Sequence, residues 1–165
     1  MDIIIDGYNL IGSEQGLHGG LESKRNWLVQ RISLYQKIKQ FKVTVIFDGW
    51  RAGRPEQVGQ KVDGVTVIYS RLDEKADAVI IRLAREKGGG SVVVTSDREI
   101  RNTVERFGAV AIAANDFSKV LRNMDIQSGE DELDEESYSG SKRGNPNRLS
   151  KLERRRQEKL KKLKI

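Results

Sequence analysis

Four aspartates are the residues of this sequence best suited to chemistry. Asp6 and Asp48 directly follow a short apolar run, Asp97 follows another such run after Thr95-Ser96, and Asp77 lies near the start of a segment with helical apolar spacing. In open parallel sheets, ligands bind beyond the carboxyl ends of the strands. Because the connections are short, we expect these carboxylates, with Glu74 just before Asp77, to converge at one edge of a sheet.

Each aspartate alone also has an ordinary structural explanation. An aspartate before glycine is common in turns, and one at a helix start caps the helix or complements its dipole. The combination is more informative, because carboxylates that lie close together repel one another unless a cation or a raised pKa relieves them. A site in which metal activates water needs such a cluster.

The composition narrows the choice of metal. The chain has no cysteine and one histidine, His18, which we expect to be solvent-exposed in a glycine-rich loop. Thiolate zinc sites, disulfides and thiol nucleophiles are therefore excluded. Carboxylates are left as the multi-ligand set, and they favour hard ions such as Mg²⁺ or Mn²⁺.

The elements that would position the acids alternate along the chain. Expected strands cover 3–5, 43–47, 65–69, 91–95 and 109–113, and expected helices cover 21–40, 74–87, 98–107 and 115–123. Asn115 is the expected N-cap of the last helix. The strands are short, continuous and rich in Val and Ile, as is typical of a parallel sheet covered on both faces. We therefore predict an α/β fold, a three-layer α/β/α architecture with a mainly parallel central sheet and a charged C-terminal tail.

Charge divides the 165-residue chain, which is 37% hydrophobic and 33% charged. Residues 125–136 include seven acidic and no basic side chains, whereas 142–165 include eleven Lys or Arg against two Glu. We predict a folded domain over 1–124, an acidic flexible linker over 125–141 and a basic tail over 142–165, helical when bound. The tail is either a disordered solubilising segment or an arm that grips RNA phosphates without reading sequence.

The formal net charge of +6 suggests an anionic partner such as nucleic acid. The chain lacks a run of about 18 apolar residues, so we expect no membrane span and no membrane partner. Its first residues are typical of a strand and not of a signal peptide, so we expect a cytoplasmic protein. The sequence does not set the oligomeric state.

Residues beside the aspartates are candidates for supporting roles and for RNA contacts. Asn9 either hydrogen-bonds an aspartate or a phosphate, or is a turn residue, and Ser96 either positions substrate or caps the next helix. Trp50 follows Asp48 closely and either stacks on a base or folds back onto the domain. The candidate RNA contacts are Trp50, Arg51, Arg54, Arg71, Lys75 and Arg98, while Lys24 and Arg25 either extend a basic rim or are ordinary surface charge.

Four short motifs together resemble a known family. They are Asp6-Gly7-Tyr8-Asn9, Phe47-Asp48-Gly49, Lys75-Ala76-Asp77-Ala78-Val79-Ile80 and Thr95-Ser96-Asp97-Arg98. In order and spacing they resemble the NYN branch of the PIN-like nucleases, and more narrowly the YacP-type proteins, which include a ribosome-associated endoribonuclease. The resemblance covers about residues 1–124.

This resemblance implies a PIN-like fold and a ribonuclease site that uses Mg²⁺ or Mn²⁺, with catalytic and metal-binding roles for Asp6, Asp77 and Asp97. The chain departs from the family pattern at Ile81, where an acid often stands. Two functions follow: a metal-dependent endoribonuclease acting on ribosome-associated mRNA or structured RNA, or a non-cutting RNA- or ribosome-binding factor. The supporting positions that we assign are Asn9, Asp48, Glu74 and Ser96.

Overall fold

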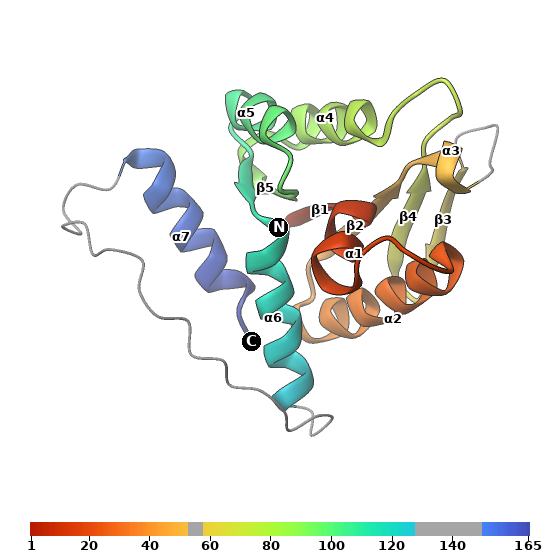
Figure 1. Ribbon diagram of the computed structural model, residues 1–165. Helices are drawn as coiled ribbons and strands as arrows, with labels where there is room; N and C mark the ends of the chain where they lie inside the picture. Colours follow the sequence, from red (N-terminus) through yellow and green to blue (C-terminus); the bar gives the residue numbers. More distant parts are fainter. Residues whose placement is uncertain (53–57, 128–149) are drawn as a thin grey trace.

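A sheet forms the centre of the protein (Figure 1). The computed structural model describes residues 1–52, 58–127 and 150–165, and within them six strands follow the order β3-β4-β2-β1-β5-β6. Neighbouring strands are parallel, except that β3 is antiparallel to β4, so the predicted mainly parallel sheet is confirmed. The strands are β1 (Asp2–Asp6), β2 (Lys42–Phe47), β3 (Val58–Val62), β4 (Val65–Tyr69), β5 (Ser91–Val94) and β6 (Val110–Ile112).

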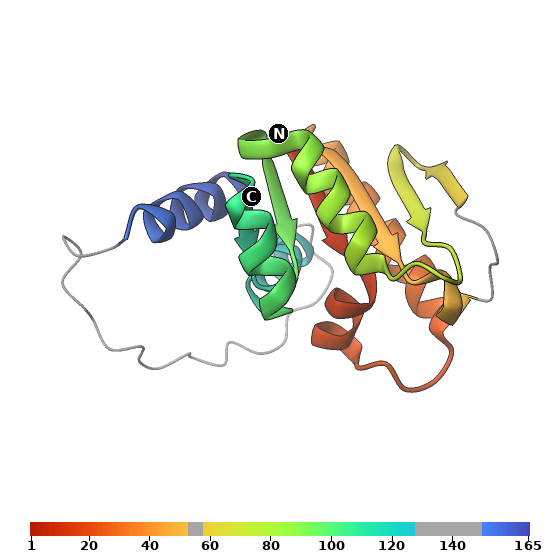
Figure 2. The ribbon, with the colours of Figure 1, turned by 90° about the horizontal axis from the view of Figure 1, so that it is seen from above.

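Helices cover both faces of this sheet, which confirms the predicted three-layer architecture (Figures 1 and 2). Helices α1, α2 and α6 pack on one face, and α4 and α5 pack on the other. The helices are α1 (Gly7–Gln15), α2 (Leu21–Lys39), α3 (Gly49–Ala52), α4 (Ala76–Lys87), α5 (Arg98–Arg106), α6 (Ala114–Gln127) and α7 (Lys151–Leu163), with a short 3-10 helix at Gly88–Gly90.

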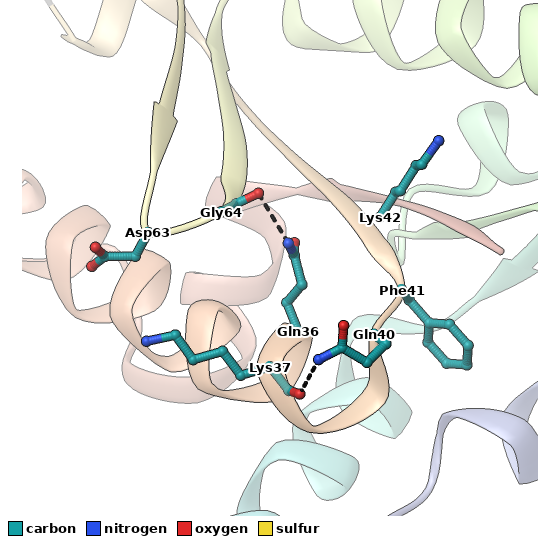
Figure 3. Close-up of a pocket in the computed structure, with 7 residues that line it drawn as sticks. All are labelled: Gln36, Lys37, Gln40, Phe41, Lys42, Asp63 and Gly64. Carbon is teal, nitrogen blue, oxygen red and sulfur yellow. Dashed lines mark hydrogen bonds between the residues drawn. The ribbon is translucent and has the colours of Figure 1, made fainter.

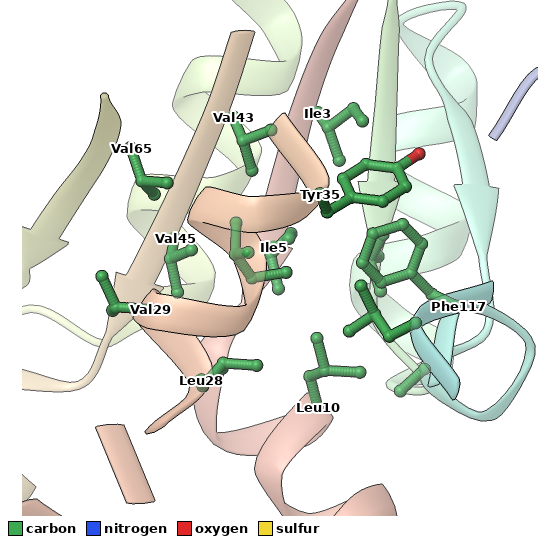
Figure 4. Close-up of a cluster of buried hydrophobic side chains, with 14 of the residues drawn as sticks. Ile3, Ile5, Leu10, Leu28, Val29, Tyr35, Val43, Val45, Val65 and Phe117 are labelled. Carbon is green, nitrogen blue, oxygen red and sulfur yellow. The ribbon is translucent and has the colours of Figure 1, made fainter. Parts of the chain in front are cut away.

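The central strand β1 shows why the strands are continuously apolar. Successive side chains of a strand point to opposite faces. Ile3 and Ile5 therefore join the cluster that holds Tyr35 and Phe117 (Figure 4), whereas Ile4 joins the cluster under α4 and α5. A strand buried on both faces has no position at which a polar residue would meet solvent.

Four elements were not predicted, namely α1, the edge strand β3 and the two short helices α3 and Gly88–Gly90. In β3 the residues Gly59, Gln60 and Lys61 are exposed, so the strand has no apolar pattern. The sequence did offer a signal in the Asp63-Gly64 turn, where both residues have positive φ, 48° and 91°. Asp-Gly at such a turn is the preferred connection of a two-residue hairpin.

Two predicted helix caps are wrong. Helix α6 begins at Ala114, so Asn115 lies inside it, and the helix continues through Gln127 into the predicted linker. The N-cap of α5 is Asp97 and not Ser96, because the Asp97 carboxylate accepts hydrogen bonds from two backbone N–H groups of the first turn. The Ser96 hydroxyl instead accepts a 3.1 Å hydrogen bond from the backbone N–H of Ala114.

The C-terminal helix α7 packs along β6, the last strand of the described sheet (Figure 1). Arg156 Nε donates a 3.0 Å hydrogen bond to the backbone oxygen of Ala111 in β6. The Tyr35 hydroxyl donates a 3.0 Å bond to the Leu163 carbonyl, and the Leu163 side chain is buried in the main cluster. Helix α7 therefore shields the open edge of the sheet, where unpaired backbone groups would otherwise invite another strand.

This packing changes the picture of the charged tail. Of the predicted basic tail over 142–165, residues 151–163 form α7 on the folded domain. Residues 128–149 lie outside the described residues, so the division into domain, linker and tail stays a prediction. None of the helices in the described part of the chain is long and apolar enough to cross a membrane.

Candidate active site

The ends of β1 and β5 bring two of the predicted acids to the same edge. The two strands are parallel neighbours, with Ile5 paired to Val94, so the residues that follow them emerge side by side. Buried Thr95 joins these ends, because its Oγ1 donates a 3.1 Å hydrogen bond to Asp6 Oδ2 and accepts a 3.1 Å bond from the Asp97 N–H. Figure 2 shows the strand arrows pointing toward this edge, beyond which α1 lies.

Asp6 ends β1 and also caps α1. Its Oδ1 accepts a 3.3 Å hydrogen bond from the backbone N–H of Asn9. Burial raises the pKa of Asp6 from 3.8 to about 6, and the negative charges of Asp77 and Asp97 add to this rise. The hydrogen bonds from Asn9 and Thr95 lower that pKa but do not offset the burial. Asp6 is therefore an acid whose charge is poorly stabilised near neutral pH.

Asp77 and Asp48 belong to the same electrostatic group. Asp77 lies in the first turn of α4 and is exposed. Partial burial of its carboxyl raises the pKa of Asp77, and the charge of Asp97 raises it further. The charge of Lys75 lowers this pKa, and that of Asp48 adds a smaller rise. Asp48 directly follows β2, and its Oδ1 accepts a 3.1 Å bond from the Trp50 N–H. The structure thus brings all four aspartates to the carboxyl edge of the sheet.

Asn9 and Ser96 hold the connection that carries Asp97. Asn9 Oδ1 accepts a 2.8 Å hydrogen bond from the Ser96 backbone N–H, which joins α1 to the segment after β5. The hydroxyl of Ser96 is in turn bonded to the start of α6. Both side chains therefore have a structural task at the edge of the candidate site.

Other predicted site residues are less closely associated with the acids. Glu74 Oε1 forms a 2.6 Å ion pair with Arg82 Nη1 on the outside of α4. Arg71 pairs with Asp73 at 3.3 Å, and both side chains are largely exposed. Lys75 and Arg98 are exposed at the starts of α4 and α5. Arg54 lies outside the described residues.

Trp50 and Arg51 extend from the end of β2 in α3. The Trp50 residue is 72% exposed, so its indole ring stands in solvent instead of folding back onto the domain. The guanidinium carbon of Arg51 lies 5.6 Å from the centroid of the Tyr8 ring, a cation–π distance. An exposed aromatic residue and an arginine therefore follow Asp48 in the same short helix.

Sequence reasoning missed Ser70. This residue is fully buried after β4, and its Oγ accepts a 3.0 Å hydrogen bond from the Gly49 N–H. Its own N–H donates a 3.0 Å bond to the Phe47 carbonyl, which ties the ends of β2 and β4 together. The available signal was a small polar residue placed directly after the apolar run 65–69, in the same manner as the aspartates.

The acids fit a hard divalent cation in ligand type and in charge. Carboxylate oxygens are the ligands that Mg²⁺ and Mn²⁺ prefer, and a cation would offset the burial and the repulsion that raise the pKa of Asp6 and Asp77. Within residues 1–52, 58–127 and 150–165, however, no group of three or more Asp, Glu or His side chains is close enough to hold an ion. The four aspartates are thus electrostatic neighbours and not a closed coordination shell.

A groove of about 370 Å³ lies at the opposite edge of the sheet, where β2 and β4 begin (Figure 3). It is away from the aspartates, and two hydrogen bonds within it, from Gln36 to Gly64 and from Gln40 to Lys37, hold its walls. We assign it no part in the candidate site. Its lining residues are Gln36, Lys37, Gln40, Phe41, Lys42, Asp63 and Gly64.

Comparison with known proteins agrees with this fold. The chain is similar to the crystal structure of Rae1 (YacP) from Bacillus subtilis, with 25% identity over 78% of this chain and 78% of that chain and a TM-score of 0.64. A tryptophan-to-leucine variant of that protein gives 24% identity over 76% of this chain and 77% of that chain, with a TM-score of 0.62.

The family assignment rests on a wider match. No curated protein sequence matches the chain significantly. The family model described as the YacP-like NYN domain, in contrast, matches residues 3–164, nearly the whole chain. The protein therefore belongs to the YacP-like NYN domain family, which indicates a function of nuclease type that acts on RNA.

Proposed function

We propose that this protein is a divalent-metal-dependent endoribonuclease that hydrolyses RNA phosphodiester bonds at the carboxyl edge of its sheet. The observation that supports this most is the group of acids around Asp6. Burial and the charges of Asp77 and Asp97 raise the pKa of Asp6 to about 6, a condition that a bound cation would relieve. Perturbed carboxyls of this kind gather at functional sites more often than elsewhere.

In this proposal Asp6, Asp77 and Asp97 hold Mg²⁺ or Mn²⁺. Such an ion, when bound, lowers the pKa of a water molecule and stabilises charge on phosphate oxygens. Thr95 keeps the Asp6 carboxylate in one orientation through its 3.1 Å hydrogen bond, and Asn9 holds the connection before Asp97. Hydrolysis would break the bond to the 3′-oxygen and leave a 5′-phosphate and a 3′-hydroxyl.

The proposed RNA contacts surround the acids. Trp50 offers a ring on which an unpaired base stacks, and Arg51 offers a guanidinium for a phosphate. Asp48, Glu74 and Ser96 stay supporting positions. The further contacts that we propose are Arg71, Lys75 and Arg98, which are exposed, and Arg54, which lies outside the described residues.

The test is cleavage of a labelled single-stranded RNA and of a structured RNA in Mg²⁺, in Mn²⁺ and in EDTA. Asp97→Asn is the informative variant, because asparagine still accepts hydrogen bonds at the N-cap of α5 while the charge is lost. Asp2→Asn makes the same change at the opposite end of β1, where Asp2 pairs with Lys87 at 3.6 Å. We expect metal-dependent cutting by the wild type and by Asp2→Asn, and at least about 100-fold slower cutting by Asp97→Asn.

A second function is favoured by one observation, the absence of a closed group of three acids among the described residues. A non-cutting RNA- or ribosome-binding factor would bind RNA equally in EDTA and in Mg²⁺, and would leave both RNAs intact. Cutting by Asp97→Asn at the wild-type rate, with folding unchanged, would refute the proposed site. The assay is then repeated with translating ribosomes in the reaction, since ribosome-held RNA in the cytoplasm is the substrate that we propose to test next.

A further inference from the structure

Tyr8 contacts two arginines from different elements. The Nη1 of Arg25, in the second turn of α2, donates a 2.8 Å hydrogen bond to the Tyr8 hydroxyl. The guanidinium of Arg51, in α3, lies over the Tyr8 ring at 5.6 Å. Both positive charges act on the same phenol. Residues far apart in the sequence are therefore gathered around one aromatic side chain.

The Tyr8 ring is itself held rigidly. It is 7% exposed and meets Phe47 edge-on, with 5.2 Å between ring centroids. Phe47 stacks in turn on Tyr69 at 5.6 Å. This aromatic row lies under the ends of β2 and β4. The ring and hydroxyl of Tyr8 are therefore fixed supports for the two guanidinium groups.

Neither of these arginines is neutralised within the described residues. Arg31 pairs with Glu14 and Asp125, and Arg156 pairs with Glu105. Arg25 and Arg51, in contrast, form no ion pair with a carboxylate in the part of the chain that the structure describes. A guanidinium has five N–H donors, and the bond to Tyr8 uses one of those of Arg25. The other donors stay available to an anion.

The location of this pair is informative. Tyr8 is two residues after Asp6, and Arg51 is three residues after Asp48, so the positive pair lies beside the acids at the carboxyl edge. The acids would repel a phosphodiester, and a positive group next to them offsets that repulsion. Arg51 also directly follows Trp50 in the sequence, whose exposed ring is one on which an unpaired base can stack.

We propose that Tyr8, Arg25 and Arg51 form a phosphate-binding unit for single-stranded RNA, in which Tyr8 is a positioning residue and Arg25 contacts a backbone phosphate next to the cleaved bond. This inference rests on the proposed function for its place in catalysis, but the binding itself needs no cleavage. A duplex keeps its bases stacked and paired, so it leaves the Trp50 ring without a partner.

Binding is measured with the full chain in EDTA, using a labelled single-stranded RNA and a duplex of the same sequence. We expect Arg25→Ala to weaken binding of the single strand about tenfold, as the loss of a charge-assisted hydrogen bond does. The slope of log affinity against log salt should fall by about 0.7, the value for one phosphate contact on a single strand. In a cleavage assay, KM rises and kcat is little changed.

Tyr8→Phe tests the positioning role. It keeps the ring that Arg51 covers and removes only the hydroxyl to which Arg25 donates. We expect weaker binding than wild type, and no further loss when Tyr8→Phe is added to Arg25→Ala, because the hydroxyl acts through Arg25. Arg85→Ala is the matched control. Arg85 lies in the last turn of α4, and its guanidinium also covers a ring, that of Phe107, at 4.6 Å. This variant should bind like wild type.

Four results would overturn the proposal: unchanged affinity and salt slope in Arg25→Ala, additive losses in the double variant, equal weakening by Arg85→Ala, or duplex binding as tight as that of the single strand. Failure of the proposed function looks different. A chain that never cuts RNA, yet loses single-strand affinity in Arg25→Ala, would refute the nuclease and retain this unit. A wild type that cuts RNA, with an Arg25→Ala variant whose KM and single-strand affinity are both unchanged, would retain the nuclease and refute this unit.

Discussion

The Thr95 hydroxyl donates a 3.1 Å hydrogen bond to Asp6 Oδ2 and accepts one of the same length from the Asp97 N–H. A single buried hydroxyl therefore orients two of the proposed metal-binding acids. Thr95 directly follows β5 and Asp6 ends β1, so this bond joins two strands that are adjacent in space although the two residues are 89 positions apart in the sequence. The carboxylates depend on this bond for their relative position, since Asp97 follows Thr95 by two residues.

Thr95→Val tests that dependence. Valine keeps the shape but leaves the Asp97 N–H without its acceptor and Asp6 without a donor, which should lower the free energy of unfolding by about 1–3 kcal/mol. Because this hydrogen bond lowers the pKa of Asp6, its loss should raise that pKa above about 6. The pH of half-maximal cleavage should rise with it. Thr95→Ser keeps the hydroxyl, and a pH profile that moves equally in Ser and Val variants would contradict the argument.

The pH dependence of stability follows from the same acid. The pKa of Asp6 is about 6 in the folded protein and 3.8 for an unperturbed aspartate, so the folded state binds the proton more tightly. The free energy of unfolding should therefore fall as pH rises from about 4 through about 6. The total fall, reached above the pKa of the folded state, is about 3 kcal/mol. In EDTA, chemical unfolding at a series of pH values should show this fall in the wild type.

Asp6→Asn should flatten that dependence, because the amide does not ionise. The variant should unfold at a higher denaturant concentration than wild type at pH 7. The amide has one acceptor oxygen, so one of the two hydrogen bonds from Thr95 and Asn9 is lost, and this loss reduces the gain in stability. Cleavage should be lost. Asp2→Asn, at the other end of β1, serves as control. A pH slope in Asp6→Asn as steep as that of wild type would place the effect on another group.

Much of the fold was predictable, since burial on both faces of a strand leaves a clear pattern. The predicted strand over 65–69 has the bounds of β4, and the other four predicted strands differ from the structure by about a residue at their ends. Three aspartates follow these runs, two of them directly and Asp97 after Ser96, and this was enough to predict that they share an edge. The exposed edge strand β3 has no such pattern, and α1 has two glycines that favour a turn interpretation.

Contacts between distant elements were not predictable in this way. Nothing in the local sequence of Thr95 shows that β5 lies beside β1, and so its bond to Asp6 had no signal. The same is true of Arg156, whose target is a backbone oxygen of β6. The residues next to Arg156 in the sequence are nearly all charged, so this segment is typical of a solvated helix. The buried position of Leu163 and the bond from Arg156 to β6 appear only in the structure, and they show that one face of α7 is packed.

The packing of α7 gives the third prediction. Arg156→Ala removes the bond to Ala111 and the 2.7 Å ion pair with Glu105, a carboxylate that is 12% exposed. We expect a loss of about 1–3 kcal/mol in the free energy of unfolding. Leu163→Ala should lower it by about 2–5 kcal/mol, as for other buried leucines. Lys162→Ala, on the solvated face of α7, should change little.

The comparison is made by urea unfolding, with light scattering to detect association, because a frayed α7 exposes the edge of β6. Equal midpoints for Arg156→Ala, Leu163→Ala and Lys162→Ala would contradict the packing of this helix. A fall in stability without any rise in scattering would leave the packing supported and the protection of the edge refuted.

The close approach of α1 to β2 gives the last prediction. A Cβ atom added at Gly7 would lie 2.3 Å from Phe47 Cε1 and 2.9 Å from the Ile46 carbonyl oxygen. A backbone oxygen cannot yield as a flexible side chain does, so the first turn of α1 must move and carry its N-cap Asp6 with it. Gly7→Ala should therefore lower the free energy of unfolding by about 1–3 kcal/mol and slow cleavage as well.

Gly12→Ala is the matched control within the same helix. The nearest atom to an added Cβ there is Leu17 Cγ at 3.8 Å, an ordinary contact. Alanine is the better helix former, so this variant should gain up to about 1 kcal/mol and keep its activity. Urea unfolding and RNA cleavage are measured for both variants. If Gly7→Ala gained stability as Gly12→Ala does, the contact between α1 and β2 would not constrain the position of Asp6, and the dependence of the acid group on this glycine would be wrong.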